Sequence, residues 1–155
     1  MLQIRRYEPR DKGAIKALHY AGVAQMDPGA DPADDTFRDA DLDDIEEHYL
    51  DNNGDFLVGE EGDEIVVIGA VRKVTDTLGE IKRIRVSRDC QRRGYAKMIL
   101  VELTERARAL GYKELILDTL ENNLGAQKMF EGCGFAENHR GMRGNYHLIF
   151  YTKQI

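Results

Sequence analysis

The chain has 155 residues, of which 42% are hydrophobic and 32% charged, a composition typical of one globular domain rather than of a disordered chain. No apolar run approaches the roughly 20 residues of a membrane span, and charge at Arg5 and Arg6 is unlike a secretory signal. Its two cysteines cannot build a disulfide scaffold, and no His or Cys spacing indicates a metal site. We therefore expect a single domain over residues 1–155, without a metal, in the reducing cytoplasm.

The net charge of −6 is unevenly distributed. Residues 27–64 hold 16 acidic residues and one basic residue, whereas the rest of the chain holds 12 acidic and 21 basic residues. An acidic chain argues against nucleic-acid binding. The division indicates that one region could attract a cation and another an anion, unless both are simply solvated surface.

Hydrophobic periodicity and turn residues predict strands and helices in the order β-α-α-β-β-β-α-β-α-β-β. Strands are expected at 2–7, 56–60, 65–75, 80–86, 114–119, 135–140 and 146–153, and helices at 11–24, 42–50, 94–110 and 123–131. The first helix should bury Ile15, Leu18 and Ala21 or Gly22, and the second Leu42, Ile45 and Tyr49. Residues 27–35, rich in proline and aspartate, should form a surface loop. This order predicts an α/β (α+β) sandwich with a mixed sheet, whose strands 80–86 and 114–119 are parallel.

The segment 86–96 joins the end of a strand, a basic turn and the start of the longest predicted helix. The N-terminus of a helix leaves backbone N–H groups unpaired and carries partial positive charge. Gly94 allows a ligand to approach the backbone closely. Further charge comes from Arg88, Arg92, Arg93 and Lys97. The segment therefore predicts a pyrophosphate site. The alternative is an ordinary turn between a strand and a helix, with arginines at the surface. The segment matches neither the dinucleotide-binding glycine motif nor a P-loop.

Two motifs carry a resemblance to a known family. Gln91-Arg92-Arg93-Gly94-Tyr95-Ala96 resembles the Q/R-x-x-G-x-G/A motif of the GNAT superfamily of acetyl-CoA-dependent N-acetyltransferases. Residues 123–135 resemble its N-x-x-A-x-x-L-Y-E-x-x-G-F signature, with Asn123, Ala126, Glu131, Gly134 and Phe135 in register. The order of elements is also similar over essentially the whole chain. The resemblance implies a GNAT-like domain of about seven strands, mostly antiparallel, with about four helices and a splayed parallel strand pair that binds the cofactor.

The resemblance also implies acetyl-CoA as co-substrate. The backbone of Gln91, Arg92, Arg93, Gly94, Tyr95 and Ala96 would then hold the pyrophosphate. Ile84, Arg85 and Val86 would pair with the pantetheine arm, and the N–H of Val86 would polarise the thioester carbonyl. Asn123 would hydrogen-bond the arm from its other side.

Acetyl transfer needs a neutral acceptor amine, so a base must remove its proton. Glu80 is the candidate base, because it precedes Gly94 by 14 residues, the spacing of the base in the histone-modifying branch of the family. Strand alternation places it on the face of Ile84 and Val86. A strand-end carboxylate paired with Lys82 or Arg83 is the alternative. Phe130 stands where the family often has a tyrosine that protonates the departing thiolate; it would pack against the arm and leaves the general acid unassigned.

In the family the acceptor usually lies between the first two helices and the last hairpin. The acidic residues of that region predict a cationic amine such as a polyamine or a lysine side chain; they are Asp27, Asp31, Asp34, Asp35, Asp39, Asp41, Asp43 and Asp44. The alternatives are a non-catalytic acetyl-CoA sensor, a covalent relay through Cys90, and RNA or protein binding by the basic residues of segment 82–93. The terminal strand 146–153 could pair with a second chain in a homodimer.

Overall fold

A computed structural model describes residues 1–29 and 40–155, in which seven strands form one mixed sheet. The spatial order is β1-β2-β3-β4-β5-β7-β6, and every neighbouring pair is antiparallel except β4 and β5. The strands are β1 Gln3–Arg6, β2 Asp55–Glu61, β3 Glu64–Lys73, β4 Leu78–Val86, β5 Glu114–Leu120, β6 Ala136–Arg143 and β7 Tyr146–Gln154. The predicted mixed sheet and its parallel pair are therefore confirmed.

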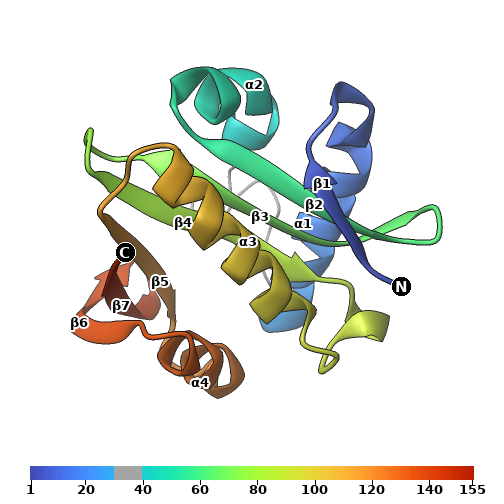
Figure 1. The fold of residues 1–155 in the computed structure, drawn as a ribbon. Helices are drawn as coiled ribbons and strands as arrows, with labels where there is room; N and C mark the ends of the chain where they lie inside the picture. Colours follow the sequence, from blue (N-terminus) through green and yellow to red (C-terminus); the bar gives the residue numbers. More distant parts are fainter. Residues whose placement is uncertain (30–39) are drawn as a thin grey trace.

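Helices cover both faces of the sheet (Figure 1), with α3 across one face and α1 behind the other. The helices are α1 Lys12–Met26, α2 Ile45–His48, α3 Tyr95–Ala109 and α4 Leu124–Gly132. One core cluster joins α3 and α4 to their face, and a second joins α1 and α2 to the opposite face. Within the described part of the chain, no helix has the length and apolarity to cross a bilayer.

The second predicted helix is wrong in extent but right in its buried residues. Leu42, Ile45 and Tyr49 are fully buried, yet the α-helical part covers only Ile45–His48, between two short 3-10 turns. Asp44 caps this helix by accepting a hydrogen bond from the backbone N–H of Glu47, so the helix begins only after it. Beyond Gly29 the predicted loop at 27–35 lies outside the described residues.

The buried stripe of α1 also differs from the prediction. Ile15, His19 and Val23 are buried, one turn apart, whereas Ala21 is exposed. Gly22 faces the side chain of Arg85 instead of the apolar core, since a Cβ added there would lie 2.8 Å from Arg85 Cδ. Gly22 therefore makes room for a long cationic side chain.

The expected dimer edge is wrong, because β7 lies between β5 and β6 inside the sheet. Leu148, Ile149 and Tyr151 of β7 are buried, which suits a strand with a neighbour on each side. The strand β6 is polar and largely exposed, and it forms this edge of the sheet. The apolar strand therefore folds back inside and leaves the polar one at the edge, where exposed backbone is less prone to pairing.

Candidate active site

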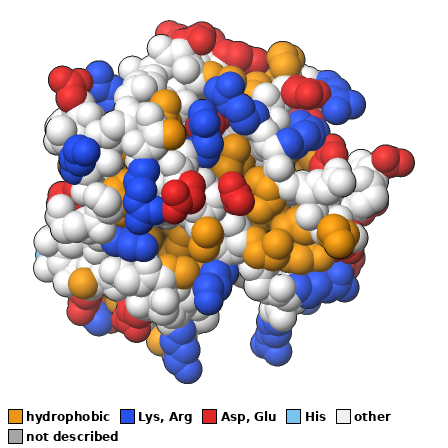
Figure 2. All heavy atoms as spheres, in the orientation of Figure 1, with side chains coloured by type: hydrophobic (Ala, Val, Ile, Leu, Met, Phe, Trp, Pro, Cys, Tyr) orange, Lys and Arg blue, Asp and Glu red, His pale blue; other side chains and the backbone are white. Residues whose placement is uncertain are grey.

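The two parallel strands separate partway along their length. They pair only from Leu78 opposite Glu114 to Glu80 opposite Ile116, whereas β5 pairs with β7 over its whole length. From Ile81 onward β4 therefore leaves its neighbour, and the predicted splay is confirmed. Figure 2 shows a notch at the surface between α4 and the turn before α3, with Lys and Arg side chains on both sides.

The backbone of β4 faces this gap at its end. The N–H of Ser87 donates to Val66 O of β3 at 2.7 Å. Successive N–H groups of a strand point to opposite sides, so the N–H of Val86 points away from β3 toward the gap. This is the orientation that a donor to a ligand lying in the gap requires.

A β-bulge in β4 changes which side chains face the gap. Lys82 is opposite Ala70 and Arg85 is opposite Ile68, so two residues of β4 lie against the single residue Gly69. Arg83 takes the left-handed conformation at this point, with φ +62°.

The bulge makes the predicted common face of Glu80 and Val86 wrong, because one extra residue reverses the alternation. Glu80 and Lys82 lie on the face of the sheet that α1 covers, because Lys82 is opposite Ala70, a member of the core cluster under α1. Val86 is opposite Val67 and packs with the cluster under α3, and Ile84 lies on the same side. The candidate base and the candidate carbonyl donor therefore lie on opposite faces of β4 at the opening of the gap.

The predicted pyrophosphate turn has an open backbone. A 3-10 turn at Arg88–Cys90 leads to α3, and both Arg92 and Gly94 have positive φ, +65° and +82°. The first-turn N–H groups of α3 have no carbonyl one turn before them. A Cβ added at Gly94 would meet no atom of the described chain within 4 Å. The turn can thus present backbone donors to an anion.

Side chains of the turn anchor it to the rest of the fold. Gln91 exchanges hydrogen bonds with Gln25 of α1, at 3.0 and 3.2 Å, and donates to Val86 O at 3.3 Å. Arg93 donates to Glu61 at 3.3 Å, and the Tyr95 hydroxyl also bonds Glu61. These contacts hold the turn between α1 and the β2–β3 hairpin.

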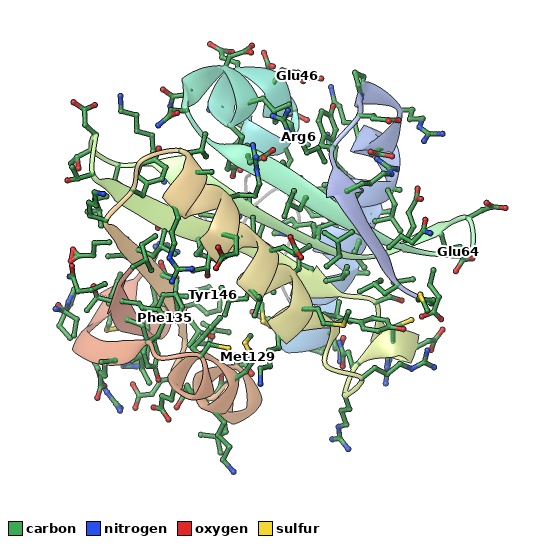
Figure 3. All side chains as sticks on the ribbon, viewed as in Figure 1. Arg6, Glu46, Glu64, Met129, Phe135 and Tyr146 are labelled. Carbon is green, nitrogen blue, oxygen red and sulfur yellow. The ribbon has the colours of Figure 1, made fainter. Side chains whose placement is uncertain are left out.

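The second signature builds α4. Asn123 caps this helix, with its Oδ1 accepting from the N–H of Ala126 at 3.2 Å, which leaves its amide NH₂ as a donor. Phe130 is only 6% exposed and packs at 6.1 Å on the rings of Phe135 and Tyr151. Phe135 and Met129 of the same region point between α4 and the sheet (Figure 3). The aromatic ring at 130 is thus mainly a core residue.

The α1 face of β4 carries a cluster of charges. Arg72 of β3 donates to Glu80 Oε1 at 2.8 Å. The alternative expectation, that Glu80 pairs with Lys82 or Arg83, is therefore wrong. Arg83 instead makes two bonds to the buried Asp41, at 2.8 and 3.0 Å. Burial of Asp41 favours its neutral form, but the paired guanidinium outweighs this and lowers its pKa to about 2. Sequence patterns gave no sign of the Asp41–Arg83 pair.

Acid should weaken this pair in a measurable way. Because the pKa of Asp41 is lower in the folded than in the unfolded chain, its contribution of about 2 kcal/mol is complete above its usual pKa and is lost as the pH falls from about 4 to 2. Urea unfolding of the protein and of Asp41→Asn should therefore show a stability difference at pH 5 that shrinks by roughly two thirds of this amount at pH 2.5, where the folded carboxyl is still partly ionised. A pH-independent difference would contradict the assigned pair.

The four described aspartates of the predicted acidic mouth all have partners. Asp41 pairs with Arg83, Asp43 bonds Lys16, Asp44 caps α2, and Asp27 accepts from the Tyr146 hydroxyl at 2.7 Å. The last contact joins the end of α1 to the β6–β7 hairpin, and Tyr146 is labelled in Figure 3. The other four members lie outside the described residues. The charge of the described part of the mouth is thus partly neutralised.

Comparison with known proteins defines the class. The Acetyltransferase (GNAT) family model matches residues 22–135, and the chain belongs to this family of acyltransferases. It is 38% identical over 99 residues to the uncharacterized N-acetyltransferase YsnE of Bacillus subtilis, covering 61% of this chain and 66% of that protein. It is 34% identical over 102 residues to human N-acetyltransferase 8, covering 61% of this chain and 44% of that protein. The chain thus spans just under two thirds of the bacterial relative and less than half of the human one.

Solved structures agree in fold over the whole chain. A GNAT-family acetyltransferase from Staphylococcus aureus Mu50 has a TM-score of 0.85 at 18% identity, with 99% of both chains covered. The yncA protein of Salmonella typhimurium, solved with its cofactor acetyl-CoA, has a TM-score of 0.80 at 20% identity, with 99% of this chain and 94% of that chain covered. At such identities the likeness establishes the fold.

Proposed function

We propose that this protein transfers an acetyl group from acetyl-CoA to a primary amine, by direct attack within a ternary complex. The observation that carries the proposal is the gap between β4 and β5, with the Val86 N–H facing it and an open anion-binding turn beside it. That a protein of the same fold was solved with acetyl-CoA supports this cofactor.

The proposed cofactor site uses backbone groups at both ends of the gap. Ile84, Arg85 and Val86 would pair with the pantetheine arm as an added strand, and residues 91–96 would bind the pyrophosphate through N–H groups. Asn123 would donate its free amide hydrogens to the arm. The fit rests on an unpaired strand edge and a glycine whose Cα faces open space.

The proposed chemistry is a single addition and elimination. The amine nitrogen attacks the thioester carbonyl carbon, the oxygen charge that develops is stabilised by the Val86 N–H, and the C–S bond then breaks. Glu80 accepts the proton of the amine, directly or through water, with Oε2, since Oε1 holds Arg72. CoA leaves as a thiolate, which has a pKa near ~8.5 and can take its proton from water or from the protonated product.

The acceptor region of this proposal lies between α1, the segment before α2 and the β6–β7 hairpin. The Asp27–Tyr146 contact brings two of these parts together. A cationic amine or a lysine side chain was predicted from the acidic residues there, and a primary amine is the class common to these acceptors. Both cysteines are free thiols, which supports a reducing compartment such as the cytoplasm.

Replacing Gly94 by alanine should weaken acetyl-CoA binding at least tenfold. The added Cβ would enter the space where the pyrophosphate is proposed to lie, and the positive φ of +82° disfavours any side chain. Gly111→Ala is the matched control, because Gly111 also has a positive φ, +99°, and open space around it, but at the far end of α3. Titration calorimetry with acetyl-CoA should separate the two variants; equal affinities would contradict the proposed cofactor site.

A further inference from the structure

We propose that Lys82 binds a carboxylate of the acceptor, so that the acceptor is an amine with a carboxylate a few bonds from its amino group, as in an α-amino acid. The inference rests on the proposed acetyl transfer and names the class of acceptor. An α-amino acid would present its amino group to Glu80 and its carboxylate to Lys82.

Lys82 lies where the acceptor would have to be. It is two residues beyond Glu80, the last residue of β4 that pairs with β5. Its partner across the sheet is Ala70, a member of the core cluster under α1 and α2. The lysine therefore stands on the acceptor side of β4, at the opening of the gap.

The ammonium group of Lys82 differs from its cationic neighbours in having no described carboxylate bound to it. Among the residues that the structure describes, the cluster has the cations Arg72, Lys82 and Arg83 and the carboxylates Glu80 and Asp41. Each carboxylate already bonds an arginine, Glu80 to Arg72 and Asp41 to Arg83. Within residues 1–29 and 40–155, Lys82 forms no ion pair. Of the three cations, Lys82 is thus the one whose ammonium group can pair with a carboxylate of a ligand, as far as the described side chains go.

The surroundings of the amine favour an anionic ligand. Burial, and then the charge of Arg83, lowers the pKa of Lys82, which means that its charged form is destabilised in the protein alone. A carboxylate placed beside the ammonium would remove this destabilisation and form a charge-assisted hydrogen bond in a partly desolvated place. A second cation would increase the repulsion instead.

The spacing of Lys82 and Glu80 selects the kind of molecule. Alternate residues of a strand lie on one face about 7 Å apart. An amine near Glu80 and a carboxylate near Lys82 can then belong to one small molecule if few bonds separate them. Simple monoamines and diamines would leave Lys82 without an anion.

The first test compares acceptors that differ only in this charge. The release of CoA thiol is measured with L-amino acids and with their carboxamides, for the protein, for Lys82→Met and for the exposed control Lys113→Met. We expect the protein and the control to prefer the amino acid about ten- to a hundredfold in kcat/KM, the size of one charged hydrogen bond. Lys82→Met should lose this preference through a raised KM for the amino acid alone. Equal rates for acid and amide, faster reaction of diamines, or an equal loss on every acceptor would overturn the proposal.

A second test does not depend on turnover. Lys82 is labelled with trinitrobenzenesulfonate in the presence of CoA, and labelling is followed by peptide mass spectrometry. The N-acetyl forms of glycine, leucine, phenylalanine and glutamate should slow labelling of Lys82, whereas their amides should not. Equal labelling with acids and amides would overturn the carboxylate site. Absence of turnover with every amine, together with protection by the acids, would reject the transfer reaction and keep the site.

Discussion

Replacing Glu80 by glutamine should lower kcat for acetyl transfer by about 10²- to 10⁴-fold, the range for a general base, and should leave acetyl-CoA affinity unchanged. The carboxylate lies at the last paired position of β4, on the acceptor side, with one oxygen bonded to Arg72. Glutamine keeps an oxygen for Arg72 but cannot accept the proton. Stopped assays of CoA release and calorimetry on the same sample measure both quantities.

Glu60→Gln is the control for this variant. Glu60 also pairs with an arginine, Arg5 at 2.6 Å, on a strand of the same sheet, but it lies on β2, away from the gap. Its kcat should equal that of the unchanged protein. A Glu80→Gln variant with full kcat would show that water or another group takes the proton. A protein that binds acetyl-CoA but releases no CoA would favour the sensor alternative, which Phe130 at the usual tyrosine position keeps open.

Asp55→Ala should destabilise the fold by about 3 kcal/mol, because it removes a buried carboxylate that joins three elements. Asp55 is 0% exposed and accepts from Arg6 Nε of β1 at 3.0 Å and from Arg106 Nε of α3 at 2.7 Å. Both arginines are partly exposed, so water can solvate them once the carboxylate is removed. The loss of unfolding free energy should therefore lie at the lower end of the range for a broken buried ion pair.

Urea unfolding measures this effect, with Asp43→Ala as its counterpart. Asp43 also pairs with a cation, Lys16, but its side chain is 63% exposed. An exposed pair contributes little, so its loss should leave the free energy of unfolding nearly unchanged. If the two variants unfolded alike, Asp55 would not have the role that its burial assigns to it.

The sequence pattern predicts an element correctly where buried residues recur regularly along that element. The helix predicted at 94–110 is observed at Tyr95–Ala109, because Leu100, Leu103 and Ala107 recur on one buried face. Gly94 marks its start because the turn needs a positive φ that glycine adopts easily. The class of fold and the candidate anion-binding turn could therefore be predicted from sequence.

Features that depend on tertiary contacts were missed. An arginine gives no sign of a left-handed conformation, so the bulge at Arg83 was not predicted, and with it the face of Glu80 was assigned wrongly. Likewise, the position of β7 between β5 and β6, with the exposed strand β6 at the edge, depends on pairing between strands. Lys82 was considered as a partner of Glu80 and as one of several basic residues; that Glu80 pairs with Arg72 instead depends on contacts between strands.

The release of CoA thiol from acetyl-CoA, measured against cationic, neutral and carboxylate-bearing amines, tests the central claim most directly. We expect saturable release that depends on the amine, with the amine recovered as its N-acetyl derivative and amino acids as the preferred group. A rate that stays at the level of spontaneous hydrolysis with every amine, despite tight binding of acetyl-CoA, would contradict the assignment of acetyl transfer to a primary amine.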